Sequence, residues 1–190
     1  MAAIEAVPVM MKADRLQYVS LTEMEKTKLG KKDDKTNVMR ILEQKKAEYK
    51  HFGAPLQEVL SGVEMAEKFG FDKDKVFKTL VTVGKSKNHF VFMIPVAEEL
   101  DLKKAAQAVG EKSIVMLPQK ELLALTGYVH GGCSPIGMKK FFKTTIHKSA
   151  ENFDTIIFSA GRVGYQVELS LEELSKVISF SLGDVVVSDK

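Results

Sequence analysis

Apolar positions recur at helical spacing in five stretches of the chain. In one stretch, Ser61 and Glu64 have the spacing of a capping box and Gly70 follows the last apolar position, so both helix ends are marked. Ser170 and Glu173 repeat the capping-box spacing further on. The pattern therefore predicts helices over Thr36–Lys46, Ser61–Phe69, Leu102–Val109, Gln119–Leu125 and Ser170–Phe180.

Runs of β-branched and aromatic residues predict six strands. Two of them, Val76–Val83 and His89–Val96, are separated by a turn-forming segment and are expected to pair as a hairpin. The other four are Ser113–Leu117, Phe141–Ile146, Thr155–Ser159 and Tyr165–Leu169. No internal repeat or Pro/Gly-rich linker interrupts residues 36–184, so we expect one α+β domain. The pattern does not decide between a barrel and an open sheet.

Composition narrows the class of protein. The chain has 190 residues, 45% of them hydrophobic, which is enough for one domain with its own core. Its one cysteine, Cys133, excludes an intramolecular disulfide framework and an all-cysteine metal site. The uncharged run Asn88–Ala97 is too short to span a bilayer. The net charge of +3 permits an acidic partner such as RNA without requiring one.

The first 33 residues differ in character from the rest. They have no basic region ahead of an apolar stretch, which argues against a targeting signal. Met1–Lys35 holds seven basic and six acidic residues, and this near balance argues against a dedicated RNA-binding arm. We expect residues 1–33 to form a flexible N-terminal extension and residues 34–187 to form the functional domain.

A lysine stands in the middle of the strand predicted at Val76–Val83. Strand alternation puts Lys78 and Leu80 on one face and Thr79 on the other, and both faces are largely apolar. Burying a lysine there is costly unless an anion pairs with its charge. Lys78 therefore either binds a phosphate, a carboxylate or a developing oxyanion, or extends to a solvated edge. Spacing alone does not separate the two.

Residues 126–137 form a glycine-rich loop. Such a loop allows a ligand to approach the backbone closely, although a plain turn-rich connection is the alternative. It matches neither a Walker loop nor a dinucleotide fingerprint. His130 with Cys133 or Ser134 could form a nucleophile pair, but no third orienting residue is apparent. The histidines show no metal-ligand spacing, so we expect no metal site. The loop residues that would contact a ligand are Gly127, Gly131, Gly132, Ser134 and Pro135.

A second loop, Phe158–Gly164, joins two predicted strands. It fits a hairpin turn, and it could also bind a ligand through the Ser159 hydroxyl and the N–H groups of Ala160 and Gly161. A basic face near this loop could make sequence-independent phosphate contacts to RNA. Its members would be Lys139, Lys140, Lys143, His147 and Arg162.

Four segments together resemble the YbaK/EbsC family, whose best-known members are Cys-tRNA(Pro) deacylases and which is similar to the editing domain of bacterial prolyl-tRNA synthetases. The segments are 77–80, 102–106, 126–137 and 159–164, in family order, and the resemblance covers about residues 36–184. It implies an α+β fold with a mixed, mostly antiparallel, barrel-like sheet of about six strands and flanking helices. It also implies a cytoplasmic enzyme that hydrolyses mischarged aminoacyl-tRNA in trans, most closely Cys-tRNA(Pro).

The resemblance assigns roles to single residues. Lys78 matches the family's functional lysine, and Thr79, Gly127, Ser159 and Gly161 match positions that contact substrate. It implies no cofactor and no covalent nucleophile from the enzyme: the substrate's own thiol attacks its ester carbonyl and leaves as a cyclic thiolactone. Lys78 and loop N–H groups would stabilise the transition state. The implied partners are the acceptor end of the tRNA and prolyl-tRNA synthetase.

Three positions depart from the family pattern. Ser61 stands where an aromatic residue is expected, Phe52 aligns loosely with an expected substrate-binding tyrosine, and Gln166 replaces a shorter or more acidic residue. These departures leave the amino-acid specificity open. One alternative is a deacylase for another small amino acid, as in Ala-tRNA(Pro), which would need a water nucleophile. The other is a non-catalytic tRNA- or nucleotide-binding module. In the cysteinyl deacylase that the resemblance implies, Cys133 is a loop residue and not a catalyst.

Overall fold

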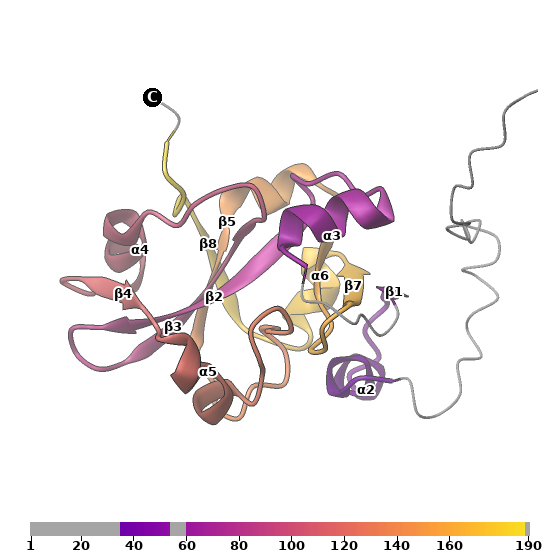
Figure 1. The fold of residues 1–190 in the computed structure, drawn as a ribbon, viewed down its shortest axis with the longest axis horizontal. Helices are drawn as coiled ribbons and strands as arrows, with labels where there is room; N and C mark the ends of the chain where they lie inside the picture. Colours follow the sequence, from indigo (N-terminus) through magenta and orange to yellow (C-terminus); the bar gives the residue numbers. More distant parts are fainter. Residues whose placement is uncertain (1–34, 54–59, 189–190) are drawn as a thin grey trace, which may run out of the picture. The chain divides into compact units, whose positions relative to one another are not determined.

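The structure, a computed structural model, describes residues 35–53 and 60–188; the predicted extension 1–33 lies outside them. These residues form five α-helices, a short 3-10 helix and eight strands (Figure 1). The helices are α2 (Asn37–Gln44), α3 (Gly62–Phe69), α4 (Leu102–Val109), α5 (Gln119–Thr126), η2 (Lys148–Asn152) and α6 (Leu171–Ser175). The strands are β1 (Lys50–Gly53), β2 (Phe77–Gly84), β3 (His89–Pro95), β4 (Ile114–Met116), β5 (Lys143–His147), β6 (Ile156–Ser159), β7 (Tyr165–Leu169) and β8 (Phe180–Gly183).

The strands form two sheets. One has the order β4-β2-β3-β5-β8 and the other the order β1-β7-β6. The β3–β5 and β5–β8 pairs are parallel and the other pairs are antiparallel, which confirms a mixed, mostly antiparallel α+β fold. The described strands do not close into a barrel, so the barrel-like arrangement is not confirmed. The sheets meet at a single parallel bridge between Val76 and Ile157, next to the start of β2.

Local capping chemistry explains the helix ends. Thr36 caps α2, because its side chain accepts a hydrogen bond from the Met39 N–H. The capping box of Ser61 and Glu64 is present at the start of α3, and Gly70 ends that helix in the left-handed conformation at φ 68°. These ends confirm the helices predicted from the sequence.

The helix predicted over Ser170–Phe180 is wrong in its second half. It ends at Ser175, and Phe180 begins β8, which pairs with β5. Glu173 also does not close a capping box: its carboxylate accepts from the Glu48 N–H at 2.7 Å and from Lys176. Hydrogen bonds to distant parts of the chain therefore override the local helical pattern. Strand β1 was not predicted either; it is short, and Phe52 is its one buried residue.

The hydrophobic core lies on both faces of the five-stranded sheet. The larger cluster includes Phe77, Val81, Met93 and Ile146, and it extends to Phe158 of the other sheet. A second cluster lies under α4, around Phe92, Ile94, Ala105 and Ala106. A third lies where the sheets meet, where Ala66 of α3 packs on Val76, Val96 and Ile157. Helix α3 therefore covers the junction of the two sheets (Figure 1).

Candidate functional site

Phe52, Gln166 and Ser159 lie in one row across the three-stranded sheet. Phe52 is directly opposite Gln166 on the neighbouring strand, and Gln166 is directly opposite Ser159, so the three side chains share a face. The Phe52 ring packs edge-on against Phe71, with the ring centroids 4.9 Å apart. Gln166 is buried, and Ser159 is half-buried. The row thus brings an apolar ring, an amide and a hydroxyl together.

Lys78 belongs to the five-stranded sheet and lies near this row of residues. The bridge between Val76 and Ile157 is parallel, so Lys78 and Ser159, each two residues further along its strand, point to the same side, although the two strands are not paired beyond the bridge. That side is the one covered by α3. The lysine and the serine that the sequence singled out in separate segments therefore lie on the same side of the two sheets, near the bridge.

The Lys78 ammonium group has a backbone partner. Its Nζ donates to the Val96 carbonyl oxygen at 3.2 Å, and no salt bridge to it is found among the described residues. Burial lowers the pKa of Lys78, while the charges of Glu99 and Glu98 oppose that shift. The sequence did not single out Val96 as the partner of the lysine, although Val96 ends the strand that was expected to pair with Val76–Val83. A half-buried cation held by a carbonyl alone can accept an anionic ligand.

The backbone polar groups of Thr79 face an edge of β2. In an antiparallel pair, alternate residues exchange hydrogen bonds with the neighbouring strand. Val96 donates to the Val76 oxygen and Gly84 donates to the Asn88 oxygen, so the even-numbered residues of β2 bond to β3. The N–H and C=O of Thr79 therefore point the other way, toward β4 and β6.

That edge is open at Thr79. Strand β4 and its continuation reach back only to Val81, whose oxygen accepts from Leu117, and β6 reaches forward only to the start of β2, where Ile157 donates to Lys75. The Thr79 Oγ1 is buried and has no hydrogen-bond partner among the residues that the structure describes. Unsatisfied buried polar groups are rare, and they concentrate where a ligand supplies the missing partner. Lys78 and Thr79 therefore flank an open strand edge.

The two glycine-containing loops pack against each other. A Cβ on Gly132 would lie 3.2 Å from the Val163 nitrogen, and a Cβ on Gly161 would lie 2.9 Å from Cε1 of Tyr128. Gly161 also has φ +84°, a conformation that glycine adopts without strain. Part of the close backbone approach that the sequence predicted thus serves contact between the loops.

The other loop residues lie in different surroundings. Gly127 ends α5 with φ +86°, and Gly131 is exposed. Ser134 is fully buried, and its Oγ accepts from the Ile136 N–H at 3.4 Å. Pro135 lines a separate cavity, described below. These contacts do not connect the four residues to Lys78, and their substrate-binding roles stay predictions.

The backbone N–H groups expected to serve a ligand in the second loop are already used. The Ala160 N–H donates to the Tyr165 oxygen at 2.9 Å, and the Gly161 N–H donates to the Ser159 Oγ at 3.3 Å. Both bonds belong to the hairpin turn itself. The hydroxyl of Ser159 can still donate its own hydrogen, so Ser159 remains able to bind a ligand.

Cys133 and His147 are not reactive surface groups. Cys133 is buried, and burial raises the pKa of its thiol to about 12, so the thiolate is not formed near neutral pH. His147 is buried beside Ser149 and 3.7 Å from Asp184, and burial lowers its pKa. The prediction that His147 belongs to an exposed basic face is therefore wrong. The described residues contain no group of three or more His, Cys, Asp or Glu side chains suited to a metal ion.

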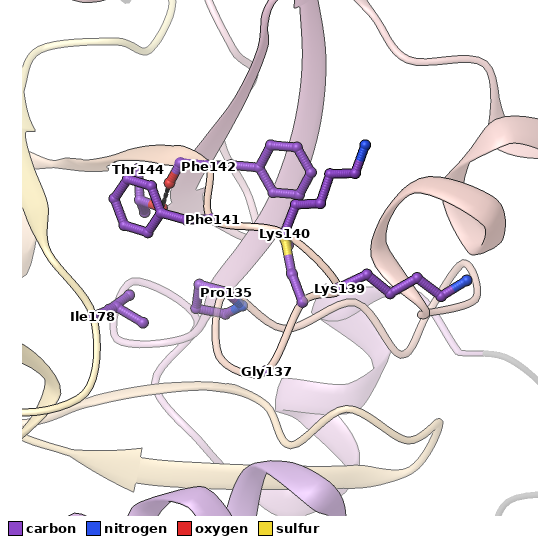
Figure 2. Close-up of a pocket in the computed structure, with 9 residues that line it drawn as sticks. Pro135, Gly137, Lys139, Lys140, Phe141, Phe142, Thr144 and Ile178 are labelled. Carbon is purple, nitrogen blue, oxygen red and sulfur yellow. Dashed lines mark hydrogen bonds between the residues drawn. The ribbon is translucent and has the colours of Figure 1, made fainter.

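A cavity of about 190 Å³ lies apart from this row of residues (Figure 2). Its lining is Pro135, Gly137, Met138, Lys139, Lys140, Phe141, Phe142, Thr144 and Ile178. The cavity includes neither Lys78 nor Ser159. Within the described residues, every helix is too short or too polar to cross a membrane.

Comparison with known proteins gives these observations a context. A family model described as an aminoacyl-tRNA editing domain matches residues 57–177. The chain is 44% identical over 160 residues to a candidate Cys-tRNA(Pro)/Cys-tRNA(Cys) deacylase, EbsC, of Enterococcus faecalis, covering 84% of this chain and 98% of that protein. It is also 36% identical over 76 residues to the proline–tRNA ligase of Shouchella clausii, covering 40% of this chain and 13% of the ligase.

A solved structure shares the fold. It is described as that of a candidate trans-editing enzyme for prolyl-tRNA synthetase, and it matches with a TM-score of 0.69 at 21% identity, over 80% of this chain and 99% of the other. The family model covers more than half of the chain, and the E. faecalis relative aligns over nearly its whole length. This chain therefore belongs to the aminoacyl-tRNA editing domain family and is an aminoacyl-tRNA deacylase.

Proposed function

We propose that this deacylase acts on Cys-tRNA(Pro) and that the reaction takes place at the open edge of β2. The observation that carries the proposal is the half-buried Lys78 ammonium on one face of the strand edge at Thr79, whose buried hydroxyl on the other face has no partner in the described residues. The name of the E. faecalis relative supports the choice of the cysteinyl substrate. The residues of the row then have separate tasks around one ester group.

The proposed reaction uses the substrate's own sulfur. The cysteinyl thiolate attacks the carbonyl carbon of its own ester, so that a C–S bond forms and negative charge collects on the carbonyl oxygen. The bond between the carbonyl carbon and the ribose oxygen then breaks, the ribose oxygen takes up a proton, and the amino acid leaves as a cyclic thiolactone. Water opens the thiolactone to cysteine afterwards. No enzyme nucleophile is needed, in agreement with the buried, protonated Cys133.

Lys78 stabilises the developing oxyanion in this proposal. Its ammonium is half-buried, where a charge interaction is stronger than in water, and its hydrogen-bond partner Val96 is a neutral carbonyl, while the carboxylates of Glu98 and Glu99 act on it without a salt bridge. The Thr79 N–H points to the strand edge between the two faces and can supply a further donor to the oxyanion, while the Thr79 hydroxyl lies on the opposite face and can contact another part of the substrate. Together Lys78 and the Thr79 N–H are stronger partners for the oxyanion than for the neutral ester, which is the requirement for catalysis.

The members of the row orient the amino acid. The Ser159 hydroxyl and the Gln166 amide can hydrogen-bond the substrate's amino group, and the Phe52 ring gives an apolar wall for its side chain. Holding the thiol against its own carbonyl removes most of the orientational entropy of the ring closure. We further propose that prolyl-tRNA synthetase supplies the tRNA selectivity, because part of this chain is similar to a proline–tRNA ligase.

A panel of acylated tRNAs tests the proposal. The full chain is incubated separately with Cys-tRNA(Pro), Ser-tRNA(Pro) and Ala-tRNA(Pro), and the remaining ester is measured over time. Serine replaces the sulfur with oxygen, and alanine removes it. We expect rapid loss of the cysteinyl ester and at least about a hundredfold slower loss of the other two, since both lack the nucleophile.

Two outcomes would contradict the proposal. Equal rates for Ala-tRNA(Pro) and Cys-tRNA(Pro) would indicate a water nucleophile. Salt-sensitive tRNA binding without any loss of ester would indicate a binding module in place of an enzyme.

A further inference from the structure

A basic and aromatic segment, Lys139-Lys140-Phe141-Phe142-Lys143, lies apart from the proposed catalytic row. Phe141 is 76% exposed, more than any other large hydrophobic side chain in the described part of the chain. The adjacent Phe142 is half-buried and packs edge-on to His89, with the ring centroids 6.2 Å apart. Figure 2 shows the two rings projecting to opposite sides of the chain. Phe142 therefore anchors the segment, and Phe141 contributes little to the core.

Phe141 stands at the cavity of about 190 Å³ (Figure 2). Pro135 and Ile178 line the cavity with apolar atoms, and the hydroxyl of Thr144 is occupied by the Phe142 oxygen at 3.1 Å. An exposed ring beside a hollow lined by both apolar and polar groups offers a flat planar group one face to stack on and a space to enter.

The charges around this ring are positive. Lys140 and Lys143 are exposed, and no salt bridge to either is found in the described parts of the chain. Lys139 differs, because its ammonium donates to the oxygens of Leu123 and Ala124 at the end of α5. Two cations without an acidic partner thus lie on either side of Phe141 along the chain, with Lys140 extending to the side of the Phe142 ring (Figure 2), and this favours an anionic, planar ligand over an apolar peptide.

We propose that this segment is a binding site for an unpaired nucleotide of RNA: the base stacks on Phe141 over the cavity, and Lys140 and Lys143 bind the neighbouring phosphates. The combination of an aromatic platform and flanking cations is how proteins bind single-stranded nucleic acid. The site deepens the proposed function, since the tRNA substrate ends in a single strand.

The site lies at a distance from the strand edge that suits a second contact on the same RNA. Thr79 pairs with Met93, which pairs with Ile146, and Thr144 lies two residues before Ile146. Standard strand spacings put the Cα atoms of Thr79 and Thr144 about 12 Å apart. A ligand that fills the strand edge therefore leaves the Phe141 site for another part of the RNA.

Fluorescence anisotropy with a labelled, unacylated single-stranded RNA octamer tests this site. The variants are Phe141→Ala, Phe141→Tyr and the double substitution Lys140→Ala/Lys143→Ala. Stacking contributes about 1–3 kcal/mol per base, so Phe141→Ala is expected to weaken binding about tenfold, and Phe141→Tyr is expected to restore it. The lysine variant is expected to reduce the slope of log affinity against log salt by about 1.4, or about 0.7 for each lost phosphate contact.

Val187→Ala is the matched control, because Val187 is also an exposed apolar residue but lies near the end of the described chain. Unchanged RNA affinity in Phe141→Ala, or equal weakening in Val187→Ala, would overturn the proposal. Equal affinity of the wild-type chain for an RNA duplex would also overturn it, because a paired base cannot stack on the ring. The RNA carries no amino acid, so this result is independent of whether the chain deacylates Cys-tRNA(Pro).

Discussion

Replacing Thr79 with valine is expected to raise the stability of the domain and to lower its deacylation rate. Valine has the shape of threonine without the hydroxyl, and the Thr79 side chain shares its face of β2 with Phe77 and Val81, which belong to the main core. The Thr79 Oγ1 is buried with no partner in the described structure. An unsatisfied buried hydroxyl costs about 1–3 kcal/mol, so Thr79→Val is expected to raise the free energy of unfolding by about 1–2 kcal/mol.

Two measurements check this expectation. In a chain of this size, each 1 kcal/mol shifts the melting temperature by about 2–4 °C, so Thr79→Val is expected to melt about 3–6 °C higher than the wild type. The same variant loses a donor to the substrate, and one hydrogen bond of about 1.4 kcal/mol corresponds to a roughly tenfold slower single-turnover deacylation. A variant that is both more stable and less active would identify Thr79 as a ligand-binding residue.

Thr82→Val is the matched control on the same strand. Thr82 is also buried, but its Oγ1 donates to the Phe90 oxygen at 3.4 Å. Its replacement removes a formed hydrogen bond and is expected to lower the free energy of unfolding by about 0.5–1 kcal/mol, with little effect on deacylation. The reasoning is refuted if Thr79→Val is destabilised like Thr82→Val, or if it deacylates at the wild-type rate.

Two further predictions concern the stability of the domain. Glu168→Ala leaves Lys75 without its partner at 2.5 Å in a partly buried position, so urea unfolding is expected to show a loss of about 2–3 kcal/mol; a loss below about 0.5 kcal/mol would contradict the pairing. Burial lowers the pKa of His147 in the folded state, so the unfolded chain takes up a proton first as the pH falls below about 6.5. Stability is therefore expected to fall between pH 7 and pH 5, and to fall less in His147→Gln; identical pH profiles would exclude this role.

The parts of the fold that the sequence predicts correctly depend on local chemistry. The Ser61–Glu64 capping box and the left-handed Gly70 are set by residues three to nine positions apart, and the structure contains both. Strand β8 depends on hydrogen bonds to β5, far back in the chain, and was therefore mistaken for the continuation of a helix. The short strand β1 was missed for the same reason, because only its pairing with β7 defines it.

In the candidate site, too, the sequence predicts the local features and not those that depend on distant pairing. Lys78 is conspicuous in the sequence because a charge interrupts an apolar strand. The position of Lys78 on the same side as Ser159 depends on one bridge between the two sheets, and no local pattern encodes it. The open edge at Thr79 is also non-local, since it arises where β4 and β6 both stop short. Sequence reasoning could therefore propose the residues but not their arrangement.

The most direct test of the account is the rate of Cys-tRNA(Pro) deacylation by Lys78→Met under single-turnover conditions. Methionine keeps much of the apolar stem of lysine and removes the charge. Loss of a preorganised oxyanion partner costs about a hundredfold to a thousandfold in rate, and we expect a decrease of that size. Lys85→Met, at an exposed position directly after β2, is the control and is expected to match the wild type. A folded Lys78→Met chain that deacylates within about threefold of the wild-type rate would contradict the proposed site.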